Sequence, residues 1–269
     1  MRQKSWRAKI QETGYSRGGT ERMNQKDRLF EKEITKTGDF VFDDRVVRVF
    51  PDMINRSVPG YGLVVPMIGM LARQYAQPDT YLYDLGCSLG AVSLAMRAAV
   101  RAGGVQIRAV DNSEDMIRQI RSTLQSGGEG SLPGIELLHQ DVLDTHIENA
   151  SVVVLNFTLQ FVEPEKRSGL LKKISEGLKP GGVLILSEKI RFEDPVEQKL
   201  QTEWHHEFKR SQGYSDLEIA RKRDALENVM KPDSMQQHLD RLHSCGFKQV
   251  NQWFQGFNFV SMVAFRPSE

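Results

Sequence analysis

A short glycine-containing run has the composition of a turn that holds a nucleoside-like ligand. Residues 84–90 read Asp-Leu-Gly-Cys-Ser-Leu-Gly, after a predicted strand and before a predicted helix. Glycine at position 86 permits a sharp turn with no Cβ in the way of a ligand, and backbone N–H groups in such a turn are expected to face that ligand. Gly90 is expected to let the helix pack close to the strand. Ser88 stands where motifs of this kind commonly have a glycine, so the match is imperfect.

Polar side chains also stand at the ends of the next three predicted strands. Asp111 ends the second strand, Asp141 ends the third and precedes Val142, and Asn156 ends the fourth. Because the carboxyl ends of parallel strands meet at one edge of a sheet, these side chains should gather around the glycine run. An acid at the end of the second strand is placed to bind ribose hydroxyls. The alternative for Asp111 is a plain cap of the helix that follows it.

The residues near this run favour a ligand containing an amino acid over one containing phosphates. The sequence has no Gly-Lys-Ser/Thr run to cradle phosphates. Asp84, just before the turn, suits a zwitterionic amino acid better than a pyrophosphate. His205 and His206 form the one histidine pair, and adjacent helix positions point about 100° apart. We therefore expect no metal site.

Strands and helices that alternate along the chain must position these residues. Strands separated by helices of about 10–15 residues indicate a parallel, doubly wound sheet. Two further predicted strands, 247–254 and 257–265, are separated by Gln255-Gly256 and should form an antiparallel hairpin. The prediction is an α/β fold with a mostly parallel seven-stranded sheet, the layout of class I S-adenosylmethionine-dependent transferases. The other strands are predicted at 81–85, 105–110, 135–139, 151–155 and 183–187, and helices at 63–74, 92–100, 113–124, 164–178 and 235–244.

Three regions do not belong to this alternation. Residues 1–22 are basic and show no apolar period, which predicts a disordered extension before a single domain at 23–269. Residues 27–75 are expected to form an N-terminal cap punctuated by Pro51 and Pro59. Residues 191–233 are strongly charged and helical in pattern, and should lie above the carboxyl ends of the strands. We expect this insertion to be a lid, a dimer contact, or both.

Composition narrows the class of protein further. The 269 residues carry 36 Lys and Arg against 35 Asp and Glu, a net charge of +1. This balance argues against direct nucleic-acid binding by bulk charge. No apolar run approaches the roughly 20 residues needed to span a bilayer, so no membrane association is expected. Two cysteines, Cys87 and Cys245, fit a reducing cytoplasm.

Several longer runs resemble one enzyme family, the carboxy-S-adenosyl-L-methionine synthases of bacterial tRNA wobble-uridine modification. The similarity extends over about residues 38–265, and the first run and the lid are its most specific parts. The runs are Val49–Tyr61, Tyr83–Ala91, Val154–Phe161, His205–Met230 and Trp253–Phe259.

The resemblance implies a methyltransferase-like fold without methyl transfer. Members of the family take S-adenosyl-L-methionine and prephenate and make carboxy-S-adenosyl-L-methionine and phenylpyruvate, with no metal. The product would serve a downstream tRNA carboxymethyltransferase in the 5-oxyacetyl modification of wobble uridine. The family is homodimeric, and a carboxylate anchor and a dry pocket matter more to the implied chemistry than a side-chain base. No catalytic residue is assigned.

The resemblance also implies a role for ten residues of this sequence as contacts of the cofactor-like substrate. The lid sequence Arg221-Lys222-Arg223 is read from composition either as a carboxylate-binding fork or as a solvated helix face, and the resemblance favours the first. Tyr61 would close over the ligand, Gly86, Cys87 and Ser88 line its methionine portion, Asp111 and Asn112 hold the ribose, Asp141 and Val142 frame the adenine, Asn156 face the sulfonium side, and Arg223, from either subunit, bind the added carboxylate.

Two other functions remain open from the sequence. A conventional S-adenosylmethionine-dependent methyltransferase acting on a small acid or on tRNA would share every cofactor residue, so only the lid argues against it. A non-catalytic S-adenosylmethionine-binding regulator is consistent with the neutral charge, but it would leave a carboxylate-binding arginine without a purpose.

Overall fold

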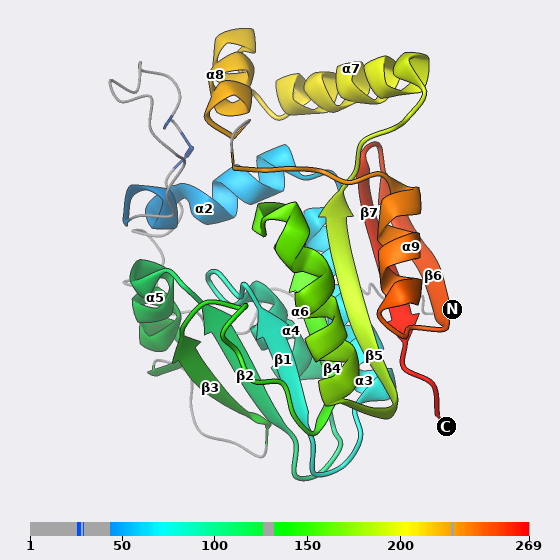
Figure 1. Cartoon of the computed structure of the whole chain (residues 1–269). Coiled ribbons are helices and arrows are strands. Elements are labelled where there is room, and N and C mark those ends of the chain that lie inside the picture. The colour runs from blue at the N-terminus through cyan, green and yellow to red at the C-terminus, as the bar shows by residue number, and fades with distance from the viewer. Residues whose placement is uncertain (1–25, 28, 30–43, 126–131, 227–228, 269) are drawn as a thin grey trace, which may run out of the picture.

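The computed structural model describes residues 26–27, 29, 44–125, 132–226 and 229–268. The predicted extension at 1–22 and part of the predicted cap lie outside these residues. Within the described part, one seven-stranded sheet runs in the order β3-β2-β1-β4-β5-β7-β6 (Figure 1). The strands are β1 (Tyr81–Leu85), β2 (Gln106–Asp111), β3 (Gly134–His139), β4 (Ala150–Asn156), β5 (Leu178–Lys189), β6 (Gln249–Gly256) and β7 (Phe259–Phe265).

The pairing of these strands confirms the predicted fold class. The pairs formed among β1 to β5 are all parallel, whereas β7 is antiparallel to both β5 and β6. After β5 the chain crosses to β6 at the edge of the sheet, and β7 then returns to lie between β5 and β6. β4 lies at the centre, and six of its seven residues are buried because helices cover both of its faces.

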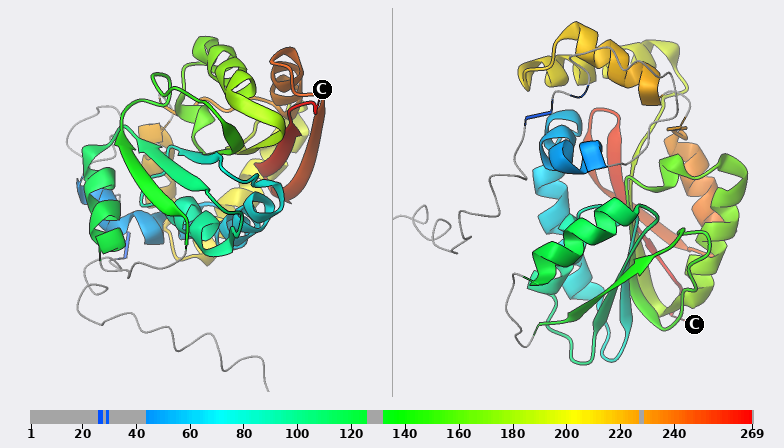
Figure 2. Two further views of the ribbon diagram at one scale, coloured as in Figure 1. Left: turned by 90° about the horizontal axis from the view of Figure 1, so that it is seen from below. Right: turned by 90° about the vertical axis from the view of Figure 1, so that its left-hand side faces the viewer.

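Helices cover the two faces of the sheet, as Figure 2 shows. The apolar residues of α3 and α4 pack on one face with β1, β4 and β5, and those of α6 and α9 pack on the other. α5 packs beside α4 against β2 and β3. The helices are α2 (Asp44–Ser57), α3 (Tyr61–Tyr75), α4 (Ala91–Ala99), α5 (Glu114–Gln125), α6 (Pro164–Gly177), α7 (Pro195–Ser211), α8 (Asp216–Leu226) and α9 (Met235–Ser244), with the 3-10 helix η2 (Leu159–Phe161).

Three helices lie above the carboxyl ends of the parallel strands. Figure 1 shows α2, α7 and α8 across the end of the sheet to which the parallel arrowheads point. α7 and α8 lie within the predicted insertion at 191–233, and we call this pair the lid. α2 packs on α5 and on α7, so the cap and the lid meet above the sheet.

Local sequence explains where several elements begin and end. Ser234 and Gln237 form a reciprocal capping box at the start of α9. Pro164 stands in the first turn of α6, where its missing N–H is not needed. Asp194 accepts a hydrogen bond from the backbone N–H of Val196 and so caps α7. α6 and α9 lie close to their predicted boundaries, and α7 lies inside the predicted insertion at 191–233.

Some details differ from the sequence expectation. The hairpin turns at Phe257-Asn258, with Phe257 at φ 54°, because Gly256 still pairs with Phe259. The expected turn at Gln255-Gly256 was therefore wrong by two residues. β5 begins at Leu178, earlier than the predicted 183, because it pairs with β4 on both sides of a register shift.

Two further expectations were wrong for packing reasons. α2 continues through Pro51, although the sequence predicted a break there. Val46, Val47 and Met53 of this helix bury their side chains together, and this burial outweighs the hydrogen bond that proline removes. Gly90 does not serve close packing against the strand. A Cβ at Gly90 would lie 2.1 Å from Cδ1 of Ile120 in α5.

Candidate active site

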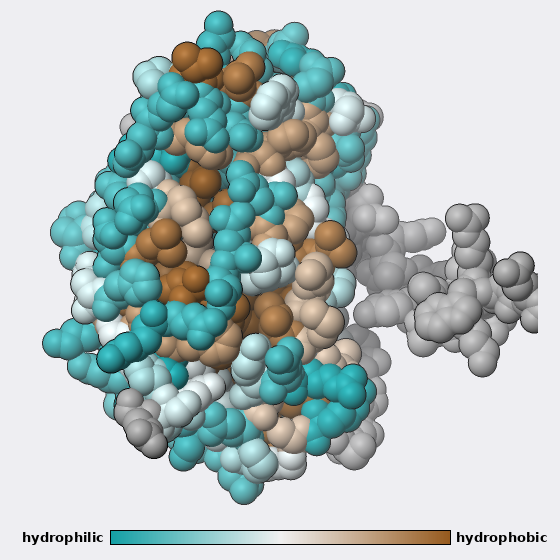
Figure 3. Space-filling model, turned by 90° about the vertical axis from the view of Figure 1, so that its right-hand side faces the viewer, coloured by the Kyte–Doolittle hydropathy of each residue, from teal (hydrophilic) through white to brown (hydrophobic). Residues whose placement is uncertain are grey.

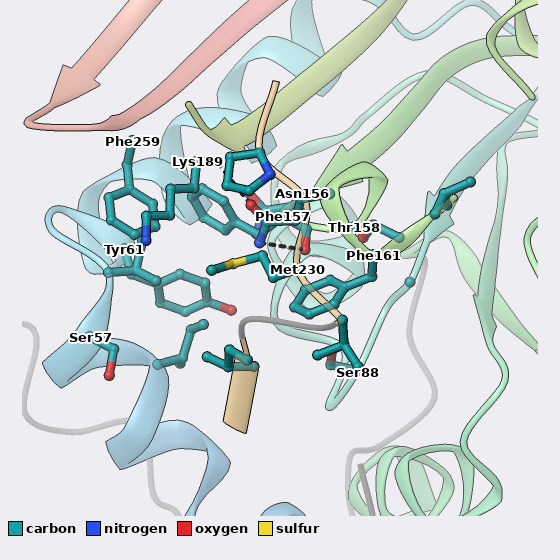
Figure 4. Close-up of a pocket in the computed structure, with 18 of the residues that line it drawn as sticks. Ser57, Tyr61, Ser88, Asn156, Phe157, Thr158, Phe161, Lys189, Met230 and Phe259 are labelled. Carbon is teal, nitrogen blue, oxygen red and sulfur yellow. Dashed lines mark hydrogen bonds between the residues drawn. The ribbon is translucent and has the colours of Figure 1, made fainter. Parts of the chain in front are cut away.

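A cavity of about 810 Å³ opens between the strand tips, α2 and the lid. Its lining comes from the ends of β1, β2, β4 and β5, from α2 and from both lid helices. All ten residues that the sequence singled out line this one cavity: Tyr61, Gly86, Cys87, Ser88, Asp111, Asn112, Asp141, Val142, Asn156 and Arg223. The structure therefore brings the predicted set together, while the role of each residue toward a ligand stays a prediction. Figure 4 shows part of this lining.

The glycine turn holds its shape through hydrogen bonds within the protein. The N–H groups of Gly86 and Cys87 both donate to the carbonyl of Val110, at 2.8 and 2.9 Å. The N–H of Ser88 donates to Oδ2 of Asp111 at 2.8 Å. These three groups are thus engaged by β2 and its end, contrary to the expectation that they face a ligand. The turn can line a ligand by close approach rather than by donating these bonds.

The structure explains the glycine at position 86 and the serine at position 88 of this turn in different ways. Gly86 has φ +80°, and a Cβ there would lie 2.4 Å from Oγ1 of Thr158, so the turn requires glycine for its conformation and for contact with the loop after β4. Ser88 also has a left-handed backbone, at φ 47°. That conformation explains why glycine is common at this position, and serine adopts it here at some cost in backbone strain.

Asp111 supports the turn before α5 and also faces the cavity, while Ser113 caps the helix, since its Oγ accepts the N–H of Met116 at 3.3 Å. Oδ1 accepts the N–H of Ser113 at 2.9 Å and Oδ2 accepts the N–H of Ser88. Its carboxylate therefore ties the glycine turn to the start of α5. Burial raises its pKa, although the two N–H groups work in the opposite direction. Each oxygen keeps a second lone pair, which leaves a ribose contact geometrically open.

Asp84 adds a second buried acid beside the same turn. It is 1% exposed and accepts a hydrogen bond from the Ser93 hydroxyl at 2.6 Å. Burial raises the pKa of Asp84 to about 6, and the nearby charge of Asp111 adds to the rise. With Asp141 also on the lining, this end of the cavity is acidic and would favour a positively charged ligand. We call it the acidic end.

The last residue of β4, just before the loop that follows the strand, carries a buried polar atom that has no partner in the described structure. Oδ1 of Asn156 is buried and makes no hydrogen bond there. The loop itself is held firmly: the N–H of Phe157 donates to Ser187 at 2.8 Å, and the N–H of Leu159 donates to Glu188 at 3.0 Å. A buried acceptor of this kind costs about 1–3 kcal/mol unless a donor reaches it. Asn156 thus presents a ready acceptor to a ligand.

Aromatic side chains form the wall between the two ends of the cavity. Phe157 lies between Tyr61 and Phe259, with ring centroids 6.4 and 5.8 Å apart. The ring of His205 packs edge-on against Phe259 at 5.0 Å. Figure 4 shows Tyr61, Phe157 and Phe259 around the same space. Burial raises the pKa of Tyr61, so its hydroxyl stays neutral. This wall gives the cavity an apolar side that suits a ligand with a ring.

The opposite end of the cavity is basic. Its lining includes Lys189 from β5, Lys209 from α7, and Lys222 and Arg223 from α8. We call it the basic end. Lys222 is held within the protein, since its Nζ donates to Oγ of Ser57 at 2.7 Å and lies 3.7 Å from Oδ2 of Asp27. Arg223 is 63% exposed at its side chain and pairs with its neighbour Asp224 at 3.0 Å.

Sequence reasoning missed the two remaining lysines of the basic end. Lys189 ends β5, so extending the strand-tip argument from the second, third and fourth strands to the fifth would have found it. Lys209 lies inside a charged helix of the lid, and no motif distinguishes it from its neighbours. Its burial depends on how α7 packs over the sheet, which the local sequence does not encode.

The described residues give no support for a metal centre or a membrane span. No group of three or more histidine, cysteine or acidic side chains among them is arranged to hold a metal ion. None of the helices in the described ranges is long and apolar enough to cross a bilayer.

Burial raises the pKa of the Cys87 thiol well above its usual range, so this cysteine lines the cavity as a neutral group and not as a thiolate nucleophile.

Comparison with known proteins gives close relatives along nearly the whole chain. Residues 82–182 match the family model described as a methyltransferase domain. A carboxy-S-adenosyl-L-methionine synthase of Aeromonas hydrophila is 56% identical over 247 residues, which cover 92% of this chain and 98% of that protein. A protein of the same name from Vibrio cholerae is 53% identical over 244 residues, covering 91% and 98%.

Solved structures show the same fold at low sequence identity. An O-methyltransferase family protein from Burkholderia thailandensis aligns with a TM-score of 0.58 at 16% identity, covering 81% of this chain and 58% of that one. Human N-acetylserotonin methyltransferase, in complex with S-adenosylmethionine, aligns with a TM-score of 0.53 at 16% identity, covering 85% and 60%. These likenesses concern the arrangement of the sheet and its helices.

Proposed function

Because the chain belongs to the carboxy-S-adenosyl-L-methionine synthase family, we propose that it converts S-adenosyl-L-methionine and prephenate into carboxy-S-adenosyl-L-methionine and phenylpyruvate. It is a transferase with a methyltransferase-like fold. The observation that carries the proposal is identity above 50% across about nine tenths of the chain and nearly the full length of the relatives. Prephenate and the link to tRNA are parts of the proposal that those names do not contain.

The acidic end of the cavity suits S-adenosyl-L-methionine. That molecule carries an ammonium and a sulfonium, and Asp84 and Asp111 supply buried negative charge near the glycine turn. The unpartnered Oδ1 of Asn156 offers an acceptor to a ligand donor. Asp111 and Asn112 would hold the ribose, and Asp141 and Val142 would frame the adenine. Tyr61, Gly86, Cys87 and Ser88 would enclose the methionine portion.

The overall conversion balances without a metal or an external oxidant. Prephenate loses its ring carboxylate as carbon dioxide and its hydroxyl as hydroxide, and the ring becomes aromatic. The sulfonium of S-adenosyl-L-methionine makes its methyl group acidic, so the methyl carbon can exchange one proton for the carbon dioxide, and the hydroxide takes that proton as water. The protein's task is to bind both molecules together and to exclude water. The aromatic wall formed by Tyr61, Phe157 and Phe259 serves that exclusion.

A homodimer is part of the proposal, and the outer surface of the lid supports it. Val196, Leu200 and Trp204 recur every four residues on α7 and are 67%, 41% and 47% exposed, which makes an apolar stripe on one helix face. In Figure 3, hydrophobic side chains lie at the surface of the molecule, including its upper end, where the lid lies. Arg223 lines the cavity of its own subunit yet is 63% exposed beside Asp224, so a second subunit docked on the lid would cover it.

The place of the product in metabolism is also proposed. Carboxy-S-adenosyl-L-methionine would be consumed in the cytoplasm by a tRNA carboxymethyltransferase that modifies wobble uridine. The near-neutral net charge of +1 supports a protein that makes this donor without itself binding tRNA.

A direct test is to incubate the purified protein with S-adenosyl-L-methionine and prephenate and to analyse the products by mass spectrometry. We expect a nucleoside product heavier than S-adenosyl-L-methionine by one carbon dioxide, and phenylpyruvate in equal amount. Formation of S-adenosylhomocysteine with a methylated acceptor would instead support the conventional methyltransferase. Absence of either product with all plausible acceptors would leave a regulator that only binds S-adenosyl-L-methionine.

A further inference from the structure

Two ammonium groups at the basic end of the cavity have no anionic partner among the residues that the structure describes. Lys189 stands at the end of β5, and Lys209 lies on α7, where it is 8% exposed. Neither side chain takes part in an ion pair or a side-chain hydrogen bond in those parts of the chain, and both line the cavity. A buried ammonium without an acceptor is rare in proteins, because leaving water costs several kcal/mol per ion.

The third lysine of the same cavity shows what a satisfied ammonium looks like here. Nζ of Lys222 reaches both the Ser57 hydroxyl and the Asp27 carboxylate, and it helps to fasten α8 to α2. Lys189 and Lys209 receive no such support. The contrast indicates that their positive charges are directed to something that enters the cavity rather than to the fold.

Electrostatic strain at the basic end supports this interpretation. Burial, together with the positive charges of Lys189 and Lys222, lowers the pKa of Lys209 to about 7. Burial also lowers the pKa of Lys189. An anion between these two groups would relieve both the desolvation and the mutual repulsion.

We propose that Lys189 and Lys209 bind the carboxylate of the α-keto acid group that the second substrate keeps through the reaction. This inference rests on the proposed function and assigns residues to its second substrate. Figure 4 shows Lys189 beside Phe259 and near Tyr61, so a ligand whose carboxylate meets this lysine can lay its ring against the aromatic wall. The far end of that ligand then points toward the acidic end of the cavity.

The choice between the two carboxylates of prephenate follows from their fates. The ring carboxylate must shed its negative charge to leave as carbon dioxide, so ammonium groups around it would stabilise the starting state and oppose the step. The α-keto carboxylate keeps its charge in substrate, transition state and product. Cations beside it bind all three equally, which tightens binding without slowing the chemical step. The lysine pair therefore fits the carboxylate that stays.

The experiment replaces each lysine by methionine, which keeps most of the length of the side chain and removes its charge. Lys189→Met and Lys209→Met should each raise the KM for prephenate about tenfold or more, with a smaller change in kcat. Titration calorimetry with phenylpyruvate, in the presence of S-adenosyl-L-methionine, should show a loss of affinity by a similar factor. Affinity for S-adenosyl-L-methionine itself should stay unchanged, and the melting temperature should hold or rise, because methionine removes a buried charge that has no partner.

Lys199→Met is a matched control on the same helix. Lys199 has 77% of its side chain exposed and lies 3.8 Å from Glu203, away from the cavity, so the KM and both affinities should equal those of the wild type. Lys209→Arg adds a second comparison, because it keeps the charge and should retain more phenylpyruvate affinity than Lys209→Met.

The two proposals fail in different ways. Wild-type enzyme that converts prephenate, with unchanged KM and unchanged phenylpyruvate affinity in both methionine variants, would overturn the lysine pair and leave the function standing. Wild-type enzyme that forms no carboxy-S-adenosyl-L-methionine would overturn the function. In that case phenylpyruvate binding still decides the pair, because calorimetry needs no turnover: binding that both methionine substitutions weaken supports an α-keto acid site, and no binding overturns it.

Discussion

The acidic and basic ends of the cavity are built in opposite ways. At the acidic end, Asp111 is tied by hydrogen bonds to Ser88 and Ser113 before any ligand arrives. At the basic end, Lys189 and Lys209 have no partner within the described structure, and Arg223 pairs only with its neighbour Asp224 at the surface. The acidic end is thus a finished part of the fold. The basic end is arranged for a charge that must come from outside.

This difference follows from where the residues stand. The acidic end lies at the tips of parallel strands, whose positions are fixed by the sheet. In the basic end only Lys189 stands at a strand tip, that of β5, and the other residues come from α7 and α8, which lie across the carboxyl ends of the strands (Figure 1). Substitution of Asp111 should therefore affect both binding and local structure, whereas substitution of Lys189, Lys209 or Arg223, which do not fasten the fold as Lys222 does, should affect mainly the recognition of anions.

The largest expected effect is at Arg223. If this arginine binds the carboxylate that the product gains in a pocket that closes over the pair, Arg223→Ala should weaken binding of carboxy-S-adenosyl-L-methionine by roughly 2–5 kcal/mol and that of S-adenosyl-L-methionine much less. Lysine at this position should rescue only in part, since a point charge does not reproduce the fork. Dissociation constants for both ligands, measured on both variants, check this.

The control for Arg223 is Asp224→Asn, which removes its surface partner and should leave both affinities near the wild type. Equal losses for the two ligands in Arg223→Ala would indicate a general defect of the lid. No loss of affinity for either ligand would show that Arg223 belongs to a solvated helix face and binds no carboxylate.

A somewhat smaller effect is expected at Asp111. Asp111→Ala should reduce S-adenosyl-L-methionine binding by about 2–3 kcal/mol, because ribose hydroxyls lose an acceptor in a buried site. The melting temperature should also fall, since the N–H groups of Ser88 and Ser113 lose theirs. Calorimetry and thermal unfolding separate the two effects. A lower melting temperature with unchanged affinity would show that Asp111 only fastens the turn.

Glu188 lies under the loop that joins the two ends and should give an effect that depends on pH. Burial raises the pKa of Glu188 to about 8, and its Oε2 has no partner in the described structure. The folded state therefore keeps the Glu188 proton to higher pH than the unfolded state, which releases it near the ordinary pKa of 4.5. The free energy of unfolding is therefore undiminished in acid and falls as the pH rises toward 8. Glu188→Gln removes that loss and keeps an oxygen for the N–H of Leu159.

Chemical denaturation at two pH values tests this prediction. Glu188→Gln should exceed the wild type in free energy of unfolding at pH 8 by on the order of 2 kcal/mol, and the difference should shrink toward pH 5. A constant difference at both values would mean that Glu188 does not titrate in this interval, and the buried carboxyl would need another explanation.

The smallest expected effect comes from the N-terminus. Residues 1–22 show no apolar period in the sequence, so deletion of these residues should leave the melting temperature and turnover nearly unchanged. A large loss of either, measured by thermal unfolding and by product formation, would show that the segment contributes to the fold or to one end of the cavity.

The sequence predicted the acidic end better than the basic end for physical reasons. The strand-turn-helix at residues 84–90 and the polar strand tips at Asp111 and Asn156 follow from local patterns that survive folding. The roles of N–H groups in the turn could not be predicted, because Val110 and Asp111 that accept them belong to another strand. Lys209 could not be singled out at all, because its burial results from packing of the lid.

The boundaries of individual elements were predicted wrongly where tertiary packing overrides a local rule. Pro51 reads as a helix breaker, yet α2 continues through it under the burial of its apolar face. Gly256 reads as the centre of a turn, yet it is paired in β6 and the turn follows at Phe257. The parallel part of the sheet was predictable because strand and helix patterns alternate without conflict.

Isotope labelling of prephenate tests the central claim most directly, because it follows each of the two carboxylates to its destination. Prephenate labelled with carbon-13 in the ring carboxylate should transfer the label to carboxy-S-adenosyl-L-methionine, and prephenate labelled in the α-keto carboxylate should leave the label in phenylpyruvate. Mass spectrometry of both products reads out the two fates. A ring label found only as free carbon dioxide, with no gain of mass by the nucleoside, would contradict the account.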